Sequence, residues 1–174
     1  MHKLAESIRS VPGFPKPGIV FRDITTLLND PAAFNEALSI FHNRYKNTPL
    51  DRVVAVESRG FIFGAALANL LQVGFVPIRK PGKLPAQTLH EEYELEYGRD
   101  TIEIHADAVK RGDRILIHDD LLATGGTSVA ACRLIERMGG SVVGLAFLIE
   151  LSFLHGRQRL GNYDVFSIIQ YESE

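Results

Sequence analysis

The sequence has little cysteine, little net charge and no long apolar run, and each shortage excludes a class of protein. The single cysteine, Cys132, cannot form an internal disulfide, and its small apolar neighbours in a helical pattern indicate a buried filler rather than a nucleophile. A formal net charge of −2 gives no electrostatic reason to expect nucleic-acid binding. No apolar stretch is long enough to span a membrane, and the first residues lack a signal-peptide core. We therefore expect a cytoplasmic protein with no membrane and no nucleic-acid partner.

What the sequence does contain is the composition of an ordinary globular domain. It has 174 residues, of which 45% are hydrophobic and 23% charged, and no repeat or linker divides them. We expect a single domain over residues 1–174. Apolar strands alternate with helical patterns, which predicts an α/β fold with a mostly parallel central sheet flanked by helices. The expected strands are 52–56, 75–78, 114–117, 142–149 and 165–169. Helices are expected after Asn29-Asp30-Pro31, after the Ser-Arg-Gly turn at 58–60, and from the glycines at 125–126 to near 139–140.

Residues 79–105 break this alternation of strands and helices. A basic segment rich in Pro and Gly comes first, followed by apolar and acidic residues that alternate with a period of two over 88–98. This alternation predicts solvated antiparallel strands, an appendage rather than part of the core. The basic segment is too long and polar for a routine connection, which favours a mobile lid. An ordinary exposed loop is the alternative for this segment taken alone.

Residues 115–128 carry the strongest functional signal. An apolar strand ends at two carboxylates, Asp119 and Asp120, and parallel sheets bind ligands at the edge where their strands end. The following small and hydroxylated residues lead into a helix, whose N-terminal N–H groups favour an anion such as phosphate. The carboxylates repel phosphate but suit the paired hydroxyls of a ribose. A capped helix with two solvated acids is the alternative. The segment thus predicts a site for a phosphorylated ribose, formed by Asp119, Asp120, Ala123, Thr124, Gly125, Gly126 and Thr127.

The same segment resembles the phosphoribosyl-diphosphate signature of the type I phosphoribosyltransferases, and its form DDLLATGGTS resembles the members that act on adenine. Five more segments resemble motifs of that branch, in the same order: GIVFRD (18–23), ESRGFIFG (57–64), IRKPGKLP (78–85), YELEYG (93–98) and LIELSFLHGR (148–157). The resemblance implies the family's fold, with a small hood and a flexible catalytic loop. It also implies purine salvage, in which 5-phosphoribose moves from 5-phospho-α-D-ribose 1-diphosphate (PRPP) to adenine, giving AMP and diphosphate.

A hydroxyl, a glycine-adjacent backbone and a guanidinium at 57–60 suit a diphosphate. The resemblance implies that this loop holds the leaving group, often through a strained peptide that here is Glu57–Ser58. It also implies a homodimer across which the basic loop partly reaches. Mg²⁺ is expected on the diphosphate and ribose oxygens, with no dedicated protein ligand. The residues expected at the diphosphate are Glu57, Ser58, Arg59, Arg79, Lys80 and Lys83, with Arg59 also catalytic.

Forming the bond to a purine nitrogen requires removal of a proton, for which a carboxylate is suited. The sequence offers Glu91, Glu92, Glu94 and Glu96, and alternation places the last three on one face. The resemblance selects Glu96 and puts Tyr97 beside the reaction centre.

The adenine pocket is expected to be apolar and partly formed by backbone. Phe21 can stack on a purine. The main chain of Val20 and Arg22 is implied to read the base, and Leu121 and Leu151 to line the other side. Taken singly, each of these residues is more often part of a core.

His118 departs from the family pattern, in which an aliphatic residue precedes the acid pair. A histidine satisfied by local hydrogen bonds is the expected role, although its charge could perturb Asp119 or Asp120.

Two rival functions remain at this point. A related transferase could use hypoxanthine, guanine or xanthine, against which the VFRD and LEYG segments argue. A regulator could keep the fold and bind nucleic acid, but it would need a basic face, which the sequence does not show.

Overall fold

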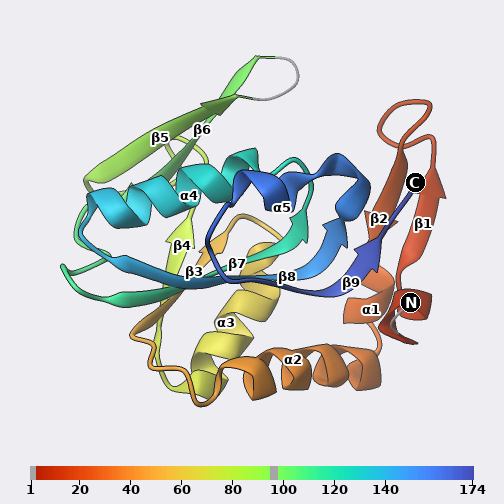
Figure 1. The fold of residues 1–174 in the computed structure, drawn as a ribbon, viewed down its shortest axis with the longest axis horizontal. Coiled ribbons are helices and arrows are strands. Elements are labelled where there is room, and N and C mark those ends of the chain that lie inside the picture. Colours follow the sequence, from red (N-terminus) through yellow and green to blue (C-terminus); the bar gives the residue numbers. More distant parts are fainter. Residues whose placement is uncertain (1–2, 95–97) are drawn as a thin grey trace.

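A five-stranded sheet, parallel throughout, forms the centre of the molecule (Figure 1). The computed structural model describes residues 3–94 and 98–174. The strand order is β4-β3-β7-β8-β9. The bounds are β3 (Arg52–Val56), β4 (Gly74–Ile78), β7 (Arg114–Leu122), β8 (Ser141–Leu151) and β9 (Val165–Tyr171). The expected α/β fold with a parallel sheet is confirmed.

Helices cover both faces of this sheet. On one face lie α2 (Pro31–Tyr45) and α3 (Gly60–Leu71), and on the other lies α4 (Gly126–Arg137) (Figure 1). The start of α2 follows the expected pattern, because the Asp30 carboxylate accepts hydrogen bonds from the backbone N–H groups of Ala32 and Ala33. Each face has its own apolar core, which explains why the central strands read as nearly continuous apolar runs.

The hairpin of β5 (Thr88–Glu94) and β6 (Arg99–His105) is antiparallel, as expected. The expectation that it is a solvated appendage is wrong. Tyr93, Ile102 and Ile104 are buried in the same core as the inner face of α4. Glu92 and Glu94 face outward, whereas Glu91 faces α4 and forms ion pairs with Arg133 and Arg137.

Strand β7 is longer than the expected 114–117. It continues to Leu122, because β8 extends beside it and pairs Asp119 with Phe147 and Leu121 with Ile149. The two acids therefore belong to the strand itself rather than to the loop after it, and the sheet fixes their backbone.

Several short elements were not expected from the sequence. The pair β1 (Arg9–Pro12) and β2 (Val20–Asp23) is antiparallel and stands with the C-terminus at one end of the sheet (Figure 1). The others are η1 (Lys3–Ser7), α1 (Thr25–Leu28), η2 (Ser152–Leu154) and α5 (Gly156–Arg159). Within the described ranges, no helix has the length and apolar character that crossing a membrane requires. Cys132 is buried in α4, as expected, and burial raises the pKa of its thiol to about 12.

Candidate active site

A cavity of about 320 Å³ opens where β3 and β7 end. It brings together residues that are far apart in the sequence but that the sequence predicted to act together. Its walls comprise Val56, Glu57, Ser58, Arg59, Lys80, Tyr93, Asp119, Asp120, Leu121 and Thr127. This one cavity therefore brings together the acid pair predicted to bind the ribose, the loop predicted to bind the diphosphate, and one residue of the basic segment.

An ion pair links the loop after β3 to the end of β7 in this cavity. Arg59 Nε lies 2.8 Å from Asp120 Oδ2, although the N–H does not point at this oxygen, which consequently accepts no hydrogen bond. Burial raises the pKa of Asp120 even though Arg59 opposes the change. Burial, followed by the charge of Asp120, raises the pKa of Asp119 well above its ordinary value. Asp119 Oδ1 accepts a hydrogen bond from the backbone N–H of Asp120, whereas Asp120 Oδ2 accepts none. That oxygen is therefore able to accept a hydrogen bond from a hydroxyl-bearing ligand.

The carboxylate of Glu57 points to the basic segment rather than into open space. It accepts hydrogen bonds from Arg79 Nε at 2.6 Å and from the backbone N–H of Lys80 at 2.9 Å. Burial would raise the pKa of Glu57, but these hydrogen bonds outweigh it and hold the pKa below its ordinary value. Glu57 therefore anchors Arg79 and Lys80 to the loop after β3, where the Glu57–Ser58 peptide bond is cis. Lys83 is exposed and lies outside the cavity wall.

The loop before α4 is packed tightly from behind. Gly125, with φ of +81°, immediately precedes the helix. A Cβ atom on Gly156 of α5 would lie 2.1 Å from the carbonyl oxygen of Ala123. Arg159 Nη1 also donates to the carbonyl of Thr124 at 3.4 Å. Residues 123–127 are therefore held against α5, with the first turn of α4 next to the cavity.

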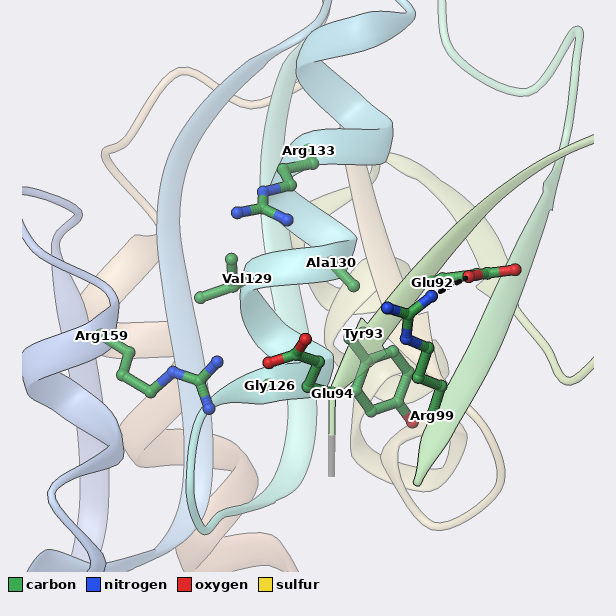
Figure 2. A pocket seen from close by; sticks show the side chains of 9 residues that line it. All are labelled: Glu92, Tyr93, Glu94, Arg99, Gly126, Val129, Ala130, Arg133 and Arg159. Atoms are coloured by element: carbon green, nitrogen blue, oxygen red, sulfur yellow. Dashed lines mark ion pairs between the residues drawn. The ribbon is translucent and has the colours of Figure 1, made fainter. Parts of the chain in front are cut away.

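A second cavity of about 420 Å³ lies between the β5–β6 hairpin and α4 (Figure 2). Tyr93 lines both cavities, so its ring forms part of the partition between them. The arginines Arg99, Arg133 and Arg159 surround the second cavity together with Glu92 and Glu94 (Figure 2).

His118 lies outside the cavity wall and is completely buried. Its ring packs edge-on against Phe41, with centroids 5.1 Å apart, and near Phe63. Burial lowers its pKa to about 3, and the backbone of Ala146 only partly opposes this change. Neither ring nitrogen makes a hydrogen bond of good geometry, so the expectation of a satisfied histidine is wrong. The ring is neutral near pH 7 and therefore exerts no charge on the acid pair.

Comparison with known proteins gives one consistent family. Residues 23–173 match the phosphoribosyl transferase domain. An adenine phosphoribosyltransferase of Chloroflexus aurantiacus is 60% identical over 168 residues, which are 97% of each chain. The crystal structure of adenine phosphoribosyltransferase from Thermoanaerobacter pseudethanolicus superposes with a TM-score of 0.94 at 53% identity, covering 97% of this chain and 98% of that one. The enzyme from Saccharomyces cerevisiae, solved with an imino-altritol bisphosphate and adenine, has a TM-score of 0.89 at 39% identity and covers 95% and 96%.

The chain belongs to the adenine phosphoribosyltransferase family. The type I phosphoribosyltransferase fold, the enzyme class and the AMP-forming activity predicted from the sequence are confirmed by this membership.

The residues that this family is expected to use for adenine lie beside the cavity to different degrees. Leu121 lines it. Phe21 is not part of the cavity wall but lies next to it, because the guanidinium of Arg59 is 5.0 Å from the Phe21 ring centroid. The Arg22 side chain turns away, donates to Ser10 Oγ at 2.5 Å and lies over the Tyr171 ring. Only its main chain is left for the expected role. Val20 is half-buried, and Leu151 packs against the core formed by α2 and α3.

The expected proton-transfer residue Glu96 and its neighbour Tyr97 lie outside the described residues. The structure adds Tyr93, which sequence reasoning missed because it stands among outward-facing acids. It also adds Gly156, and an ion pair between the buried Glu150 and the partly exposed Arg157. The only sequence signal for these three was their place inside the YELEYG and LIELSFLHGR motifs of the family.

Proposed function

We propose that the cavity between the loops after β3 and β7 holds PRPP with adenine beside it, and that this chain joins the two. The observation that supports this most strongly is the ion pair of Arg59 with Asp120. It places a guanidinium, which suits a diphosphate, beside the carboxylates that suit the ribose hydroxyls.

Each part of PRPP matches one group of residues in this proposal. The 5-phosphate binds at residues 123–127, where backbone N–H groups and the first turn of α4 favour an anion. Asp119 and Asp120 accept hydrogen bonds from the ribose hydroxyls. Arg59, Ser58 and Lys80 contact the diphosphate, and Glu57 holds Arg79 and Lys80 in reach. Adenine stacks near Phe21 and Leu121.

Mg²⁺ is part of the proposal, and it would be held by PRPP and water rather than by a dedicated protein ligand. No group of three or more His, Cys, Asp or Glu within residues 3–94 and 98–174 could hold a metal ion. In this proposal Asp119 and Asp120 lie beside the ribose, and they can accept hydrogen bonds from its hydroxyls or from water around such an ion. When bound, Mg²⁺ would neutralise negative charge on the leaving group.

Transfer breaks the C1′–O bond, so the diphosphate gains negative charge while the ribose ring becomes electron-poor. The cations of Arg59 and Lys80 stabilise that negative charge. Glu96 takes the proton that the imidazole ring of adenine loses. Closure of residues 79–97 over the site excludes water, which would otherwise hydrolyse the activated sugar.

A homodimer in the cytoplasm completes the proposal. Ile62 and Leu70 are 40% and 44% exposed two turns apart on the outer side of α3, an apolar stripe suited to a second copy of the chain. Light scattering should give twice the mass of the chain, and an Ile62→Glu variant should lower that mass.

The activity is tested by incubating the protein with PRPP, Mg²⁺ and each purine in turn and then identifying the nucleotide formed. We expect AMP from adenine and no product from hypoxanthine, guanine or xanthine. Product from another base only would reject adenine as the substrate but leave the family unchanged. Retention on nucleic acid at moderate salt, without diphosphate release, would favour a regulator instead.

A further inference from the structure

Tyr93 of β5 and Asp100 of β6 face each other across the hairpin and share the ammonium group of Lys80. They are directly paired in the strand register. Tyr93 Oη donates to Asp100 Oδ2 at 2.9 Å, and Lys80 Nζ donates to Tyr93 Oη at 3.1 Å. Lys80 Nζ also forms a hydrogen-bonded ion pair with Asp100 Oδ2. The three side chains thus form a closed ring of contacts.

This ring stands at the wall of the candidate active site. Lys80 and Tyr93 line the cavity with Asp119 and Asp120, whereas Asp100 is not part of that wall. An ammonium group has three N–H donors. Two of them are used by Tyr93 and Asp100, and the contacts of the described residues provide no partner for the third. The third donor is therefore available to a ligand in the cavity.

The opposite charges of Lys80 and Asp100 stabilise each other. Burial would lower the pKa of Lys80, but its hydrogen bonds to Asp100 and Tyr93 outweigh burial and raise the pKa. Burial would raise the pKa of Asp100, but hydrogen bonds from Lys80 and Tyr93 hold the pKa below its ordinary value. Lys80 is consequently a full cation in a fixed place, rather than a free surface lysine.

The ring of Tyr93 reaches toward the opposite end of the substrate. A Cβ atom on Gly126 would lie 3.2 Å from Tyr93 Cδ2 and 3.2 Å from the carbonyl oxygen of Glu94. Figure 2 shows the Tyr93 ring next to Gly126, at the first turn of α4. One side chain therefore touches both the start of the proposed 5-phosphate site and the proposed diphosphate lysine.

We propose that Tyr93 and Asp100 are positioning residues that aim the Lys80 ammonium at the leaving diphosphate of PRPP. The inference rests on the proposed function, since it assigns Lys80 to that diphosphate. Asp100 keeps the Lys80 ammonium positively charged, and the Tyr93 hydroxyl fixes the direction in which the ammonium points. Neither side chain needs to touch the substrate to do so.

The test measures binding of the two ends of PRPP separately, by calorimetric titration of the full-length enzyme with Mg²⁺ and either inorganic diphosphate or ribose 5-phosphate. Asp100→Asn keeps the side-chain shape but loses the charge, and we expect diphosphate binding to weaken about 10-fold, the typical effect of one charge-assisted hydrogen bond. Tyr93→Phe keeps the ring against Gly126, and we expect about 3-fold weaker binding. Both variants should bind ribose 5-phosphate as the wild type does. In steady-state assays KM for PRPP should rise while KM for adenine stays the same, and Asp100→Glu should recover part of the loss.

Glu92→Gln is the matched control, because Glu92 is an exposed acid of the same hairpin that forms a long ion pair of 3.8 Å with the exposed Arg99. It should bind both ligands like the wild type. Equal or tighter diphosphate binding by Asp100→Asn would overturn the inference. Equal weakening of both ligands would also overturn it, because that result indicates a loosened hairpin. If the wild type itself bound neither diphosphate nor PRPP, the proposed function would fail first.

Discussion

Arg59 Nε and Asp120 Oδ2 lie 2.8 Å apart, and this contact joins the loop after β3 to the end of β7. Asp120 is almost fully buried, while the Arg59 side chain keeps 35% of its surface exposed. Asp120 Oδ2 accepts no hydrogen bond although a guanidinium lies beside it, so this oxygen has unused capacity to accept one. The pair therefore looks prepared for a ligand rather than optimised for stability.

Changing Asp120 to Asn should lower kcat/KM for PRPP by about 10- to 100-fold, because one charge-assisted hydrogen bond to the ribose is lost. Steady-state assays with PRPP varied at saturating adenine would measure the loss. Asp164→Asn is a suitable control, since it breaks an exposed ion pair with Arg44 far from the cavity and should leave kcat/KM unchanged. A change of less than about 3-fold in Asp120→Asn would argue against a role for this carboxylate in sugar binding.

Changing Asp119 to Asn should stabilise the fold while it lowers activity. Burial and the nearby charge of Asp120 raise the pKa of Asp119, so the folded state holds a proton that the unfolded state has already released. The unfolding free energy therefore falls as pH rises from the ordinary pKa of Asp through the raised one, and the loss is complete above it. Asn cannot titrate and avoids that loss.

Thermal unfolding at pH 5 and pH 8 would test this prediction for Asp119→Asn. We expect the melting temperature to exceed that of the wild type by about 2–4 °C at pH 8, equivalent to ~1 kcal/mol in a chain of this size, with a smaller gain at pH 5. A gain that did not depend on pH would contradict the electrostatic explanation.

Changing Gly156 to Ala should damage the phosphate loop specifically. The new Cβ would lie 2.1 Å from the Ala123 carbonyl oxygen and 3.0 Å from the backbone nitrogen of Gly125, so backbone must move. We expect about 1–3 kcal/mol of lost stability, as is typical of overpacking, and clearly weaker binding of ribose 5-phosphate. Denaturant unfolding and calorimetric titration would measure the two effects.

Gly112→Ala provides the control for that experiment. Gly112 has φ of +87° with nothing near its Cβ position, in the turn before β7, at the opposite end of that strand. This variant should lose stability through backbone strain but bind ribose 5-phosphate normally. Similar binding losses in both variants would mean that Gly156 acts through global stability alone.

The features predictable from the sequence were those set by local pattern. The buried strand Arg52–Val56 is predictable to the residue, because a five-residue run rich in Val is too short for a helix and favours a strand. The Asp30 cap followed from its place before Pro31. The acid pair and the glycines after it could be interpreted as a ligand site, because strand, charge and helix start are adjacent in the chain.

The features that were missed depend on contacts between distant segments. Strand β7 continues past its apolar part only because β8 lies beside it. Tyr93 is buried because α4 packs on a hairpin that alternation alone describes as solvated. Glu57 was placed at the diphosphate, and no local pattern could show that Arg79 and Lys80 occupy its carboxylate. Tertiary contacts decide such cases, and one sequence does not record them.

His118 gives a prediction about acid stability. Burial lowers its pKa to about 3, so below pH 6.5 the unfolded chain binds a proton at this position that the folded chain does not. The unfolded state then binds more protons, and the unfolding free energy falls as pH drops from 6.5 toward 3. Replacing His118 by Leu removes this proton uptake and also removes two ring nitrogens that lack hydrogen bonds.

We expect His118→Leu to match or exceed the wild type in unfolding free energy at pH 7.5, and to gain on it by on the order of 2 kcal/mol by pH 4.5. Urea titrations at intervals of half a pH unit would measure the difference. His90→Gln, a change at an exposed histidine of β5, should follow the wild-type curve throughout. If the curves of His118→Leu and the wild type ran parallel from pH 7.5 to 4.5, the buried ring would have to be protonated in the fold. Its aromatic neighbours Phe41 and Phe63 offer that charge no hydrogen-bond acceptor, so we expect the curves to separate.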